Sequence, residues 1–248
     1  MSIASQHLLL LTSGVFVVAL LYSSVGHAGA SGYIAVMSLL SLAPQEIKPI
    51  ALILNIFVAS IASWQFYQAG YFSWRLFWPF SILSIPLALT GGYINLPTYW
   101  FKVLVGVVLL VSAVRLILQP PDETAVNAPT RLASPVAIGA VLGLLSGLTG
   151  TGGGIFLTPI LIFTRWARVK TAGAVSALFI LVNSIAGLSG NIAATKKFPD
   201  FAWILIAAVL VGGLCGSYLG SRRFNSTIVK RLLAIVLVIA GFKLIFTT

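Results

Sequence analysis

Acidic side chains are scarce in this sequence. The 248-residue chain contains four Asp and Glu residues against 15 Lys and Arg, which gives a net charge of +11. Charged residues make up only 8% of the chain, whereas a soluble domain carries roughly 25%. Too few polar side chains remain to cover a water-facing surface, which excludes a soluble enzyme. A basic excess can indicate nucleic-acid binding, but these cations stand singly or in small groups between apolar runs, which excludes a nucleic-acid partner.

Several chemical motifs are also missing. The single cysteine, Cys215, lies in an apolar run and rules out an intramolecular disulfide. No phosphate-binding loop ending in Gly-Lys-Ser/Thr is present, so the sequence encodes no ATP-driven motor. The acidic residues Glu46, Asp122, Glu123 and Asp200 all fall between apolar segments, which disfavours carboxylate proton relays and cation sites inside a membrane. We therefore expect no enzyme activity, no cofactor and no metal ion.

Long apolar runs dominate what is present. Hydrophobic residues make up 59% of the chain, and its mean hydropathy is +1.06. Most runs reach the roughly 20 residues that span a bilayer, but 31–43 and 153–164 are too short. The first run follows a stretch without Lys or Arg, which favours a retained membrane helix over a signal peptide. We predict an all-α polytopic membrane protein with apolar segments at 7–25, 31–43, 49–69, 72–94, 98–118, 132–149, 153–164, 169–192, 200–220 and 227–246.

The two halves of the sequence resemble each other. Matches lie near both ends of a five-segment unit, and a polar, Pro-rich stretch separates the two copies. We predict an N-terminal membrane repeat at 1–118, a cytoplasmic linker at 119–131 and a C-terminal membrane repeat at 132–248. The matching residues are Gly26–Ile34 with Gly147–Ile155 at an offset of 121, and Gly92, Lys102 and Arg115–Ile117 with Gly220, Lys230 and Lys243–Ile245 at an offset of 128.

The number of crossings in each repeat decides whether the second copy is inverted. Five crossings, or three crossings plus one re-entrant hairpin, are both odd and give inverted repeats, as in many secondary transporters. One full helix followed by a re-entrant one gives four crossings and parallel repeats. Cytoplasmic loops are rich in Lys and Arg; the inverted arrangement splits the cations ten to five, and the parallel one nine to six. The ten are Arg75, Arg115, Arg131, Arg165, Arg168, Lys170, Arg222, Arg223, Lys230 and Arg231, and the five are Lys48, Lys102, Lys196, Lys197 and Lys243.

The inverted arrangement therefore predicts the orientation of the chain. It places the central linker in the cytoplasm and both termini outside a cell (inner) membrane. The lipid bilayer is then the main partner of the outer surface. A homo-oligomer is compatible with the sequence but is not indicated by it.

Glycine-rich bends precede the two short apolar segments. The stretch Gly150–Gly154 holds four glycines in five residues, which would be costly inside an ordinary helix. A helix beginning after such a bend presents free N–H groups and a partial positive charge, which bind anions. The first-half copy, Gly29–Gly32, precedes the other short segment. Two such helix ends at the repeat interface predict an anion site; the alternative is that the glycines only allow close helix packing.

Polar side chains flank both bends and suggest the lining of that site. Hydroxyls, the His27 imidazole and two amides inside apolar segments would hold the anion together with backbone dipoles, because no fixed cation is expected there. Asn55 and Asn183 could instead join helices by hydrogen bonds. His27 could carry a coupling proton or form a capping or interhelical bond. The predicted substrate-binding residues are Ser24, His27, Gly29, Ser31, Gly32, Asn55, Thr149, Gly150, Thr151, Gly152, Gly153, Gly154 and Asn183.

The second bend resembles the signature of the TauE/SafE sulfite-exporter-like family of transmembrane permeases, and the resemblance covers essentially the whole chain. The first half departs from that pattern, with Ala30-Ser31-Gly32 in place of three glycines and Ser38 in place of the proline. The resemblance implies export of sulfite, an organosulfonate or a related small sulfur-containing anion. The matching residues are Gly150, Gly152, Gly153, Gly154, Pro159 and Leu161.

The function expected from these features is secondary transport of a small anion by alternating access, with a proton as candidate coupling ion. One alternative is a passive anion channel. Another is an intramembrane serine hydrolase, because Gly29-Ala30-Ser31-Gly32 also resembles the nucleophile motif of rhomboid proteases. Such an enzyme needs a base beside Ser31, and only His27, four residues earlier, is near in sequence.

Overall fold

A computed structural model describes residues 5–40, 42, 44–94, 110, 113–114, 132–195 and 202–225, and isolated positions between 227 and 242. Every regular element in these ranges is a helix, which confirms the all-α prediction. The predicted linker 119–131 lies outside the described residues, as does most of the predicted segment 98–118. The helices are α1 (Ser5–Ser23), α2 (Ala30–Leu39), α3 (Pro44–Gln68), α4 (Trp74–Tyr93), α6 (Ala133–Thr149), α7 (Gly154–Phe163), α8 (Val169–Thr195), α9 (Ala202–Tyr218) and the π-helix η1 (Leu219–Arg223).

Four described stretches are long and apolar enough to cross a membrane, which confirms a polytopic membrane protein. They are Glu46–Gln68, Trp74–Tyr93, Val169–Ala193 and Trp203–Arg223. Large apolar side chains cover much of the outer surface; for example, Leu9 is 72% exposed and Trp203 is 65% exposed. Such a surface is stable against lipid and unfavourable in water.

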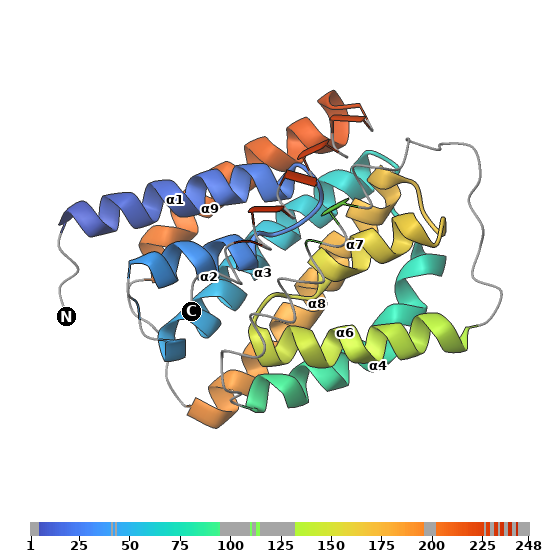
Figure 1. Ribbon diagram of the computed structural model, residues 1–248, viewed down its shortest axis with the longest axis horizontal. Helices are drawn as coiled ribbons and strands as arrows, with labels where there is room; N and C mark the ends of the chain where they lie inside the picture. Colours follow the sequence, from blue (N-terminus) through green and yellow to red (C-terminus); the bar gives the residue numbers. More distant parts are fainter. Residues whose placement is uncertain are drawn as a thin grey trace.

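The two short helices are arms of hairpins. Helices α2 and α7 contain ten residues each, so each is about 15 Å long, half of the roughly 30 Å hydrocarbon core. In Figure 1, α1 runs from the N-terminal edge into the molecule and α2 returns toward that edge. Helix α6 starts at the opposite edge, and α7 returns to it. In each half a longer helix is therefore followed by a short one that turns back, and the two hairpins begin at opposite edges of the molecule.

The two halves interlock around a central crossing of α3 and α8. Helix α4 packs against α6 and α8, while α9 packs against α1 and α3. The repeat relates α1 to α6, α3 to α8 and α4 to α9. The contacts of α9 with α1 and α3 are therefore the counterparts of the contacts of α4 with α6 and α8. The long helices α3 and α8 also run in opposite directions across Figure 1, as inverted repeats require.

Glycine stripes bring the backbones of two helix pairs into close contact. Helix α6 presents three glycines, spaced four residues apart, to α4. Helix α9 and the following η1 present three with the same spacing to α1 and to Ser24, the residue after it. A Cβ atom at any of the six would overlap a backbone carbonyl of the facing segment, so the packing requires glycine. The contacts are Gly139 with Phe80, Gly143 with Ser84, Gly147 with Ala88, Gly212 with Phe16, Gly216 with Leu20, and Gly220 with Ser24.

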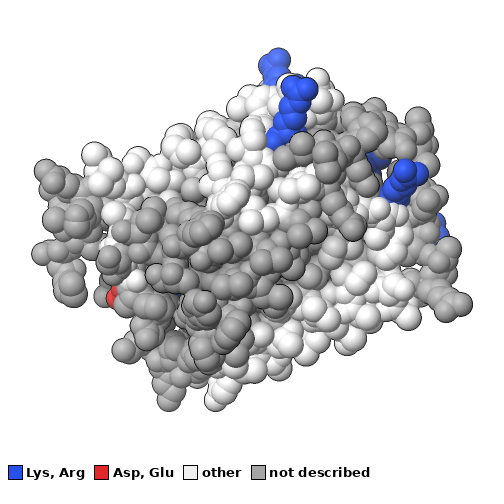
Figure 2. All heavy atoms as spheres, in the orientation of Figure 1, with Lys and Arg blue, Asp and Glu red and all other residues white. Residues whose placement is uncertain are grey.

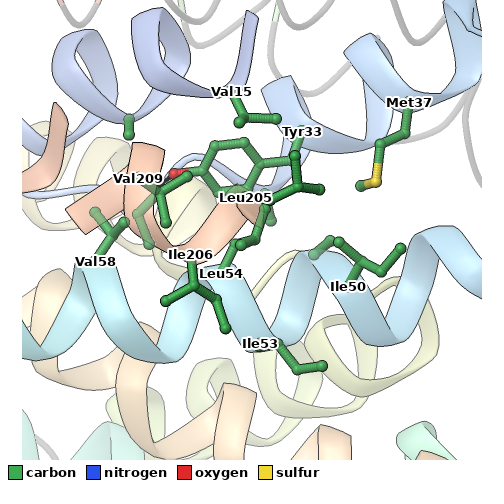
Figure 3. Close-up of a cluster of buried hydrophobic side chains, with 14 of the residues drawn as sticks. Val15, Tyr33, Met37, Ile50, Ile53, Leu54, Val58, Leu205, Ile206 and Val209 are labelled. Carbon is green, nitrogen blue, oxygen red and sulfur yellow. Dashed lines mark hydrogen bonds between the residues drawn. The ribbon is translucent and has the colours of Figure 1, made fainter. Parts of the chain in front are cut away.

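An apolar cluster fixes the first hairpin against the long helices. Tyr33 and Met37 of α2 are fully buried among side chains of α1, α3 and α9 (Figure 3). The Tyr33 hydroxyl donates a hydrogen bond to the carbonyl oxygen of Ala28, 2.5 Å away, inside the bend between α1 and α2. The cluster therefore holds both the short helix and the preceding bend in place.

Candidate functional site

The second bend depends on its glycines for backbone conformation. Gly150 ends α6 with a φ of 76°, and its N–H donates to the carbonyl of Ser146. Gly152 and Gly153 also have positive φ, 77° and 76°, and α7 begins at the next residue. Three left-handed residues in four reverse the chain at little steric cost only when they are glycines. The bend therefore presents the N-terminus of α7, as predicted.

Two buried threonines stabilise this bend by hydrogen bonds to each other. The Thr149 and Thr151 hydroxyl oxygens are 2.8 Å apart, and the backbone N–H of Thr151 donates to the Thr149 hydroxyl at 3.1 Å. Both side chains are buried. Because they bond each other, these two predicted site residues stabilise the loop that precedes α7.

The first bend uses its serines locally. Ser24 donates to the carbonyl of Leu21 at 2.7 Å, and Ser31 donates to the Tyr22 hydroxyl at 3.1 Å. Gly29 has a φ of 109°, whereas Gly32 lies in α2 and is needed for space, because a Cβ there would be 2.5 Å from the Val18 side chain. These four predicted site residues therefore shape the hairpin.

His27 connects this first bend to the second half of the chain. Its Nε2 lies 2.8 Å from the Thr158 hydroxyl on α7, and Thr158 donates to the Ser176 hydroxyl on α8 at 2.7 Å. Since the single hydroxyl proton of Thr158 goes to Ser176, Nε2 of His27 is the donor in the first bond. A neutral imidazole then has Nδ1 as an acceptor, and this buried atom has no partner among the described residues. With His27 bonded to Thr158 and Ser31 to Tyr22, the two do not form the nucleophile–base pair of a hydrolase.

The two predicted asparagines lie at the middle of α3 and α8. Both are fully buried. Asn55 Nδ2 donates to the Ser184 hydroxyl at 3.3 Å, and Asn183 Nδ2 donates to the carbonyl of Phe179 at 2.9 Å. The Oδ1 atom of each amide has no hydrogen-bond partner in the described part of the chain. Asn55 thus joins α3 to α8, as the alternative interpretation expected, whereas Asn183 bonds within its own helix. Each keeps one acceptor unused.

The N-terminus of α7 lies next to these amides. A Cβ atom at Gly152 would be 2.9 Å from Asn55 Nδ2 and 3.0 Å from Ser184 Oγ. A Cβ atom at Gly153 would be 2.9 Å from the Phe179 ring. The structure therefore brings the second bend next to Asn55 of α3 and to the Phe179 and Ser184 side chains of α8. In the first turn of α7 the Phe156 N–H donates to the Gly153 carbonyl at 3.1 Å, and the N–H groups before it have no acceptor within the helix.

Sequence reasoning missed three hydroxyl groups at this site. Thr158 lies between Gly154 and Pro159 of the recognised motif, and Ser176 and Ser184 are buried on α8. Ser176, Ile180 and Ser184 are four residues apart and share one helix face. Both bends reach this face: His27 through Thr158 to Ser176, and Gly152 to Ile180 and Ser184. That spacing is the signal that would have found the two serines.

One cationic residue lies beside the second bend, although no fixed cation is expected at the anion site. The Lys48 side chain packs against the second bend, because a Cβ at Gly150 would be 3.1 Å from Lys48 Cγ. Helix α3 begins at Pro44, ahead of the predicted apolar run, and this extension places Lys48 inside the helix. Its ammonium group donates to the carbonyls of Gly91, Gly92 and Ile94 at 3.5, 3.0 and 3.3 Å, and thereby caps the C-terminus of α4.

Lys170 makes the related contact in the second half. It lies near the start of α8, as Lys48 lies near the start of α3. Its Nζ donates to the carbonyl of Ser221 in η1 at 3.3 Å and to the Tyr71 hydroxyl at 3.4 Å. Cations are favourable at helix C-termini, so one lysine in each half stabilises the end of that half's fourth helix.

The family model and the first relative given below both match nearly the whole chain, including both halves. The family model described as "Sulfite exporter TauE/SafE" matches residues 11–244, which include both bends. "Probable membrane transporter protein y4hK" of Sinorhizobium fredii (strain NBRC 101917 / NGR234) is 39% identical over 236 residues, covering 93% of this chain and 95% of that protein. "Probable membrane transporter protein YunE" of Bacillus subtilis (strain 168) is 30% identical over 111 residues, 45% of this chain and 40% of that protein. No solved structure matches the chain.

Proposed function

We propose that this chain, which belongs to the sulfite exporter TauE/SafE family, is a secondary transporter that exports a small sulfur-containing oxyanion by alternating access. The family match and the names of its relatives make it a membrane transporter and confirm the resemblance seen in the sequence. Sulfite and organosulfonates are the substrates that we propose, by analogy with the family description and from the chemistry of the site.

The observation that carries the proposal is the N-terminus of α7 beside the α3–α8 crossing. A helix N-terminus carries about half a positive charge and several free N–H groups, which suit a small oxyanion. Asn55 from the first half approaches this helix end, and His27 from the first half bonds Thr158 of α7. The site is thus built by both halves, so a movement of one half against the other changes its access, as in inverted-repeat transporters.

The distribution of charge supports an orientation. The described Lys and Arg side chains visible in Figure 2 project from the upper and right-hand edges, where α3 and α7 end. By the positive-inside rule this edge faces the cytoplasm, and the N-terminal edge faces outward. We propose that repeats 1–118 and 132–248, joined by a cytoplasmic linker at 119–131, lie in the cell's inner membrane in this orientation.

The coupling ion that we propose is a proton carried by His27. Histidine is the side chain that changes charge near neutral pH. Its imidazole bridges the two halves through Thr158, and its Nδ1 atom, which has no partner among the described residues, can accept a proton. Protonation there would add a positive charge close to the bound anion.

Flux measurements on the purified protein in proteoliposomes test the proposal. Sulfite efflux that saturates with concentration, shows counterflow and responds to a pH gradient supports a coupled transporter. Efflux that never saturates and carries an unopposed current indicates the anion channel instead. Gly153→Leu should abolish flux by obstructing the start of α7. Gly70→Leu is the matched control, because Gly70 has a similar φ of 78° and an added Cβ would meet nothing within 4 Å. If no sulfur oxyanion moves, or if Gly153→Leu transports like Gly70→Leu, the proposal is wrong.

A further inference from the structure

The amide of Asn183 has an orientation that its surroundings determine. Its hydrogen bond at 2.9 Å is to the backbone carbonyl of Phe179, which can only accept. The amide must therefore turn its nitrogen to that carbonyl and keep its oxygen, Oδ1, as an acceptor. This oxygen is buried in the middle of α8 and has no partner among the described residues. A buried acceptor without a partner is costly, and more so within a bilayer.

Asn55 repeats this arrangement on α3. It precedes Asn183 by 128 residues, the offset that also relates Gly92 to Gly220. Its Nδ2 bonds Ser184, the residue after Asn183, so the two asparagines lie close to the same helix crossing. Its Oδ1 is also buried without a partner in the described ranges. The Ser184 hydroxyl can donate or accept, so Asn55 can reverse its amide, whereas Asn183 cannot.

Both asparagines belong to groups of residues that pack against the second bend. A Cβ atom at Gly152 would be 2.9 Å from Asn55 Nδ2, and one at Gly153 would be 2.9 Å from the ring of Phe179, whose backbone carbonyl accepts the Asn183 bond. The bend leads into α7, where the Phe156 N–H donates to the Gly153 carbonyl and the N–H groups before it have no acceptor within the helix. An anion made only of acceptor oxygens would accept hydrogen bonds from the N–H groups of α7. It could not donate to the asparagine Oδ1 atoms, which would stay unpaired and face the anion's oxygen lone pairs. An anion that also carries an O–H or N–H group would satisfy both.

We propose that Asn183, assisted by Asn55, selects anions that carry a hydrogen-bond donor of their own. The inference rests on the proposed function, because it takes the α7 N-terminus as the anion-binding end of the site. The anionic group binds the first turn of α7, and its donor group binds Asn183 Oδ1. Loss of one buried hydrogen bond should weaken binding about 10- to 100-fold.

A pair of matched sulfonates tests this selection. Ethanesulfonate and 2-hydroxyethanesulfonate share the charged group and the two-carbon chain, and they differ by one hydroxyl donor. Titration calorimetry on the full-length protein in detergent should show the hydroxylated anion binding about 10- to 100-fold more tightly. Asn183→Leu should bring this ratio close to one while ethanesulfonate still binds. Asn55→Leu is a second variant and should lower the ratio less, because Asn55 can reverse its amide.

The controls separate this proposal from the proposed function. Ser189→Ala removes an exposed hydroxyl that bonds Ile185 within α8 and should keep the wild-type ratio. Equal binding of both anions by the wild-type protein would overturn the selection and leave the anion site standing. So would an undiminished ratio in folded Asn183→Leu and Asn55→Leu proteins. Failure of either sulfonate to bind, together with the absence of sulfite flux, would reject the proposed function and the selection with it.

Discussion

The substitution Gly152→Ala tests the second bend directly. Gly152 has a φ of 77°, in the left-handed region. A Cβ atom there would be 2.7 Å from Ile180 Cγ2, 2.9 Å from Asn55 Nδ2 and 3.0 Å from Ser184 Oγ. A single methyl group therefore strains the backbone and pushes apart α3 and α8, the two helices that supply the amides of the site.

The expected magnitude is the sum of two terms. An alanine in the left-handed region costs about 1–2 kcal/mol. Overpacking a buried site by one carbon costs about 1–3 kcal/mol. The variant should therefore lose about 2–5 kcal/mol of stability in total. Gly70→Ala has the first cost alone, because Gly70 has a φ of 78° and an added Cβ there would contact nothing within 4 Å.

Thermal unfolding in detergent and sulfite flux together measure the difference. For a chain of this length, about 1 kcal/mol corresponds to roughly 2–4 °C in the unfolding midpoint. Gly152→Ala should therefore unfold about 2–12 °C below Gly70→Ala. It should also lose flux, because Asn55 and Ser184 must move, whereas Gly70→Ala should transport normally. Equal midpoints and equal flux in the two variants would refute the assignment of Gly152 to a close-packed site.

Three further predictions follow from other contacts. Lys48→Met and Lys170→Met should each lower the unfolding midpoint, by about 1–2 kcal/mol of stability, since each removes the charged cap of a helix end; unchanged midpoints would show that the capping bonds contribute nothing. His27→Ala should abolish the response of flux to a pH gradient, measured in proteoliposomes with a pH jump, and an unchanged response would exclude His27 from coupling. Gly143→Leu should destabilise the protein by more than about 4 kcal/mol, because the side chain would overlap the α4 backbone. Val141→Leu, at a position 58% exposed on the same helix, should unfold like the wild type, and similar midpoints for these two variants would contradict the packing.

Much of the fold was predictable because hydrophobic length alone determines which segments enter a membrane. The run 169–192 became α8 at Val169–Thr195, and the run 153–164 became α7 at Gly154–Phe163. The bend at these glycines was predictable for a related reason, since four glycines in five residues are costly inside a continuous helix. Apolar runs and glycine clusters are local features, so the sequence displays them directly.

The contacts of the site were not predictable to the same degree. Helices inside a bilayer are apolar on every side, so the pattern does not reveal which face meets protein. Thr158 and Ser176 were therefore indistinguishable from other hydroxyls in apolar runs, although both belong to the His27 bridge. Lys48 was missed for a different reason: the helix starts at Pro44, a favourable first helical residue, and carries the lysine past the expected boundary to the second bend.

The glycine stripes suggest where the molecule can move. In one pair of helices the stripe belongs to α6, the first helix of its half; in the related pair it belongs to α9, the fourth. The repeat therefore preserves the close approach of two helix backbones but not the helix that supplies the glycines. For this reason, aligning the two halves residue by residue does not reveal the stripes. Each stripe joins a hairpin arm of one half to a long helix of the other through contacts that leave no room for adjustment. The polar contacts His27–Thr158 and Asn55–Ser184 are few and can be exchanged for contacts with a ligand, so we expect opening and closing to occur between these residues while the glycine pairs move as rigid units.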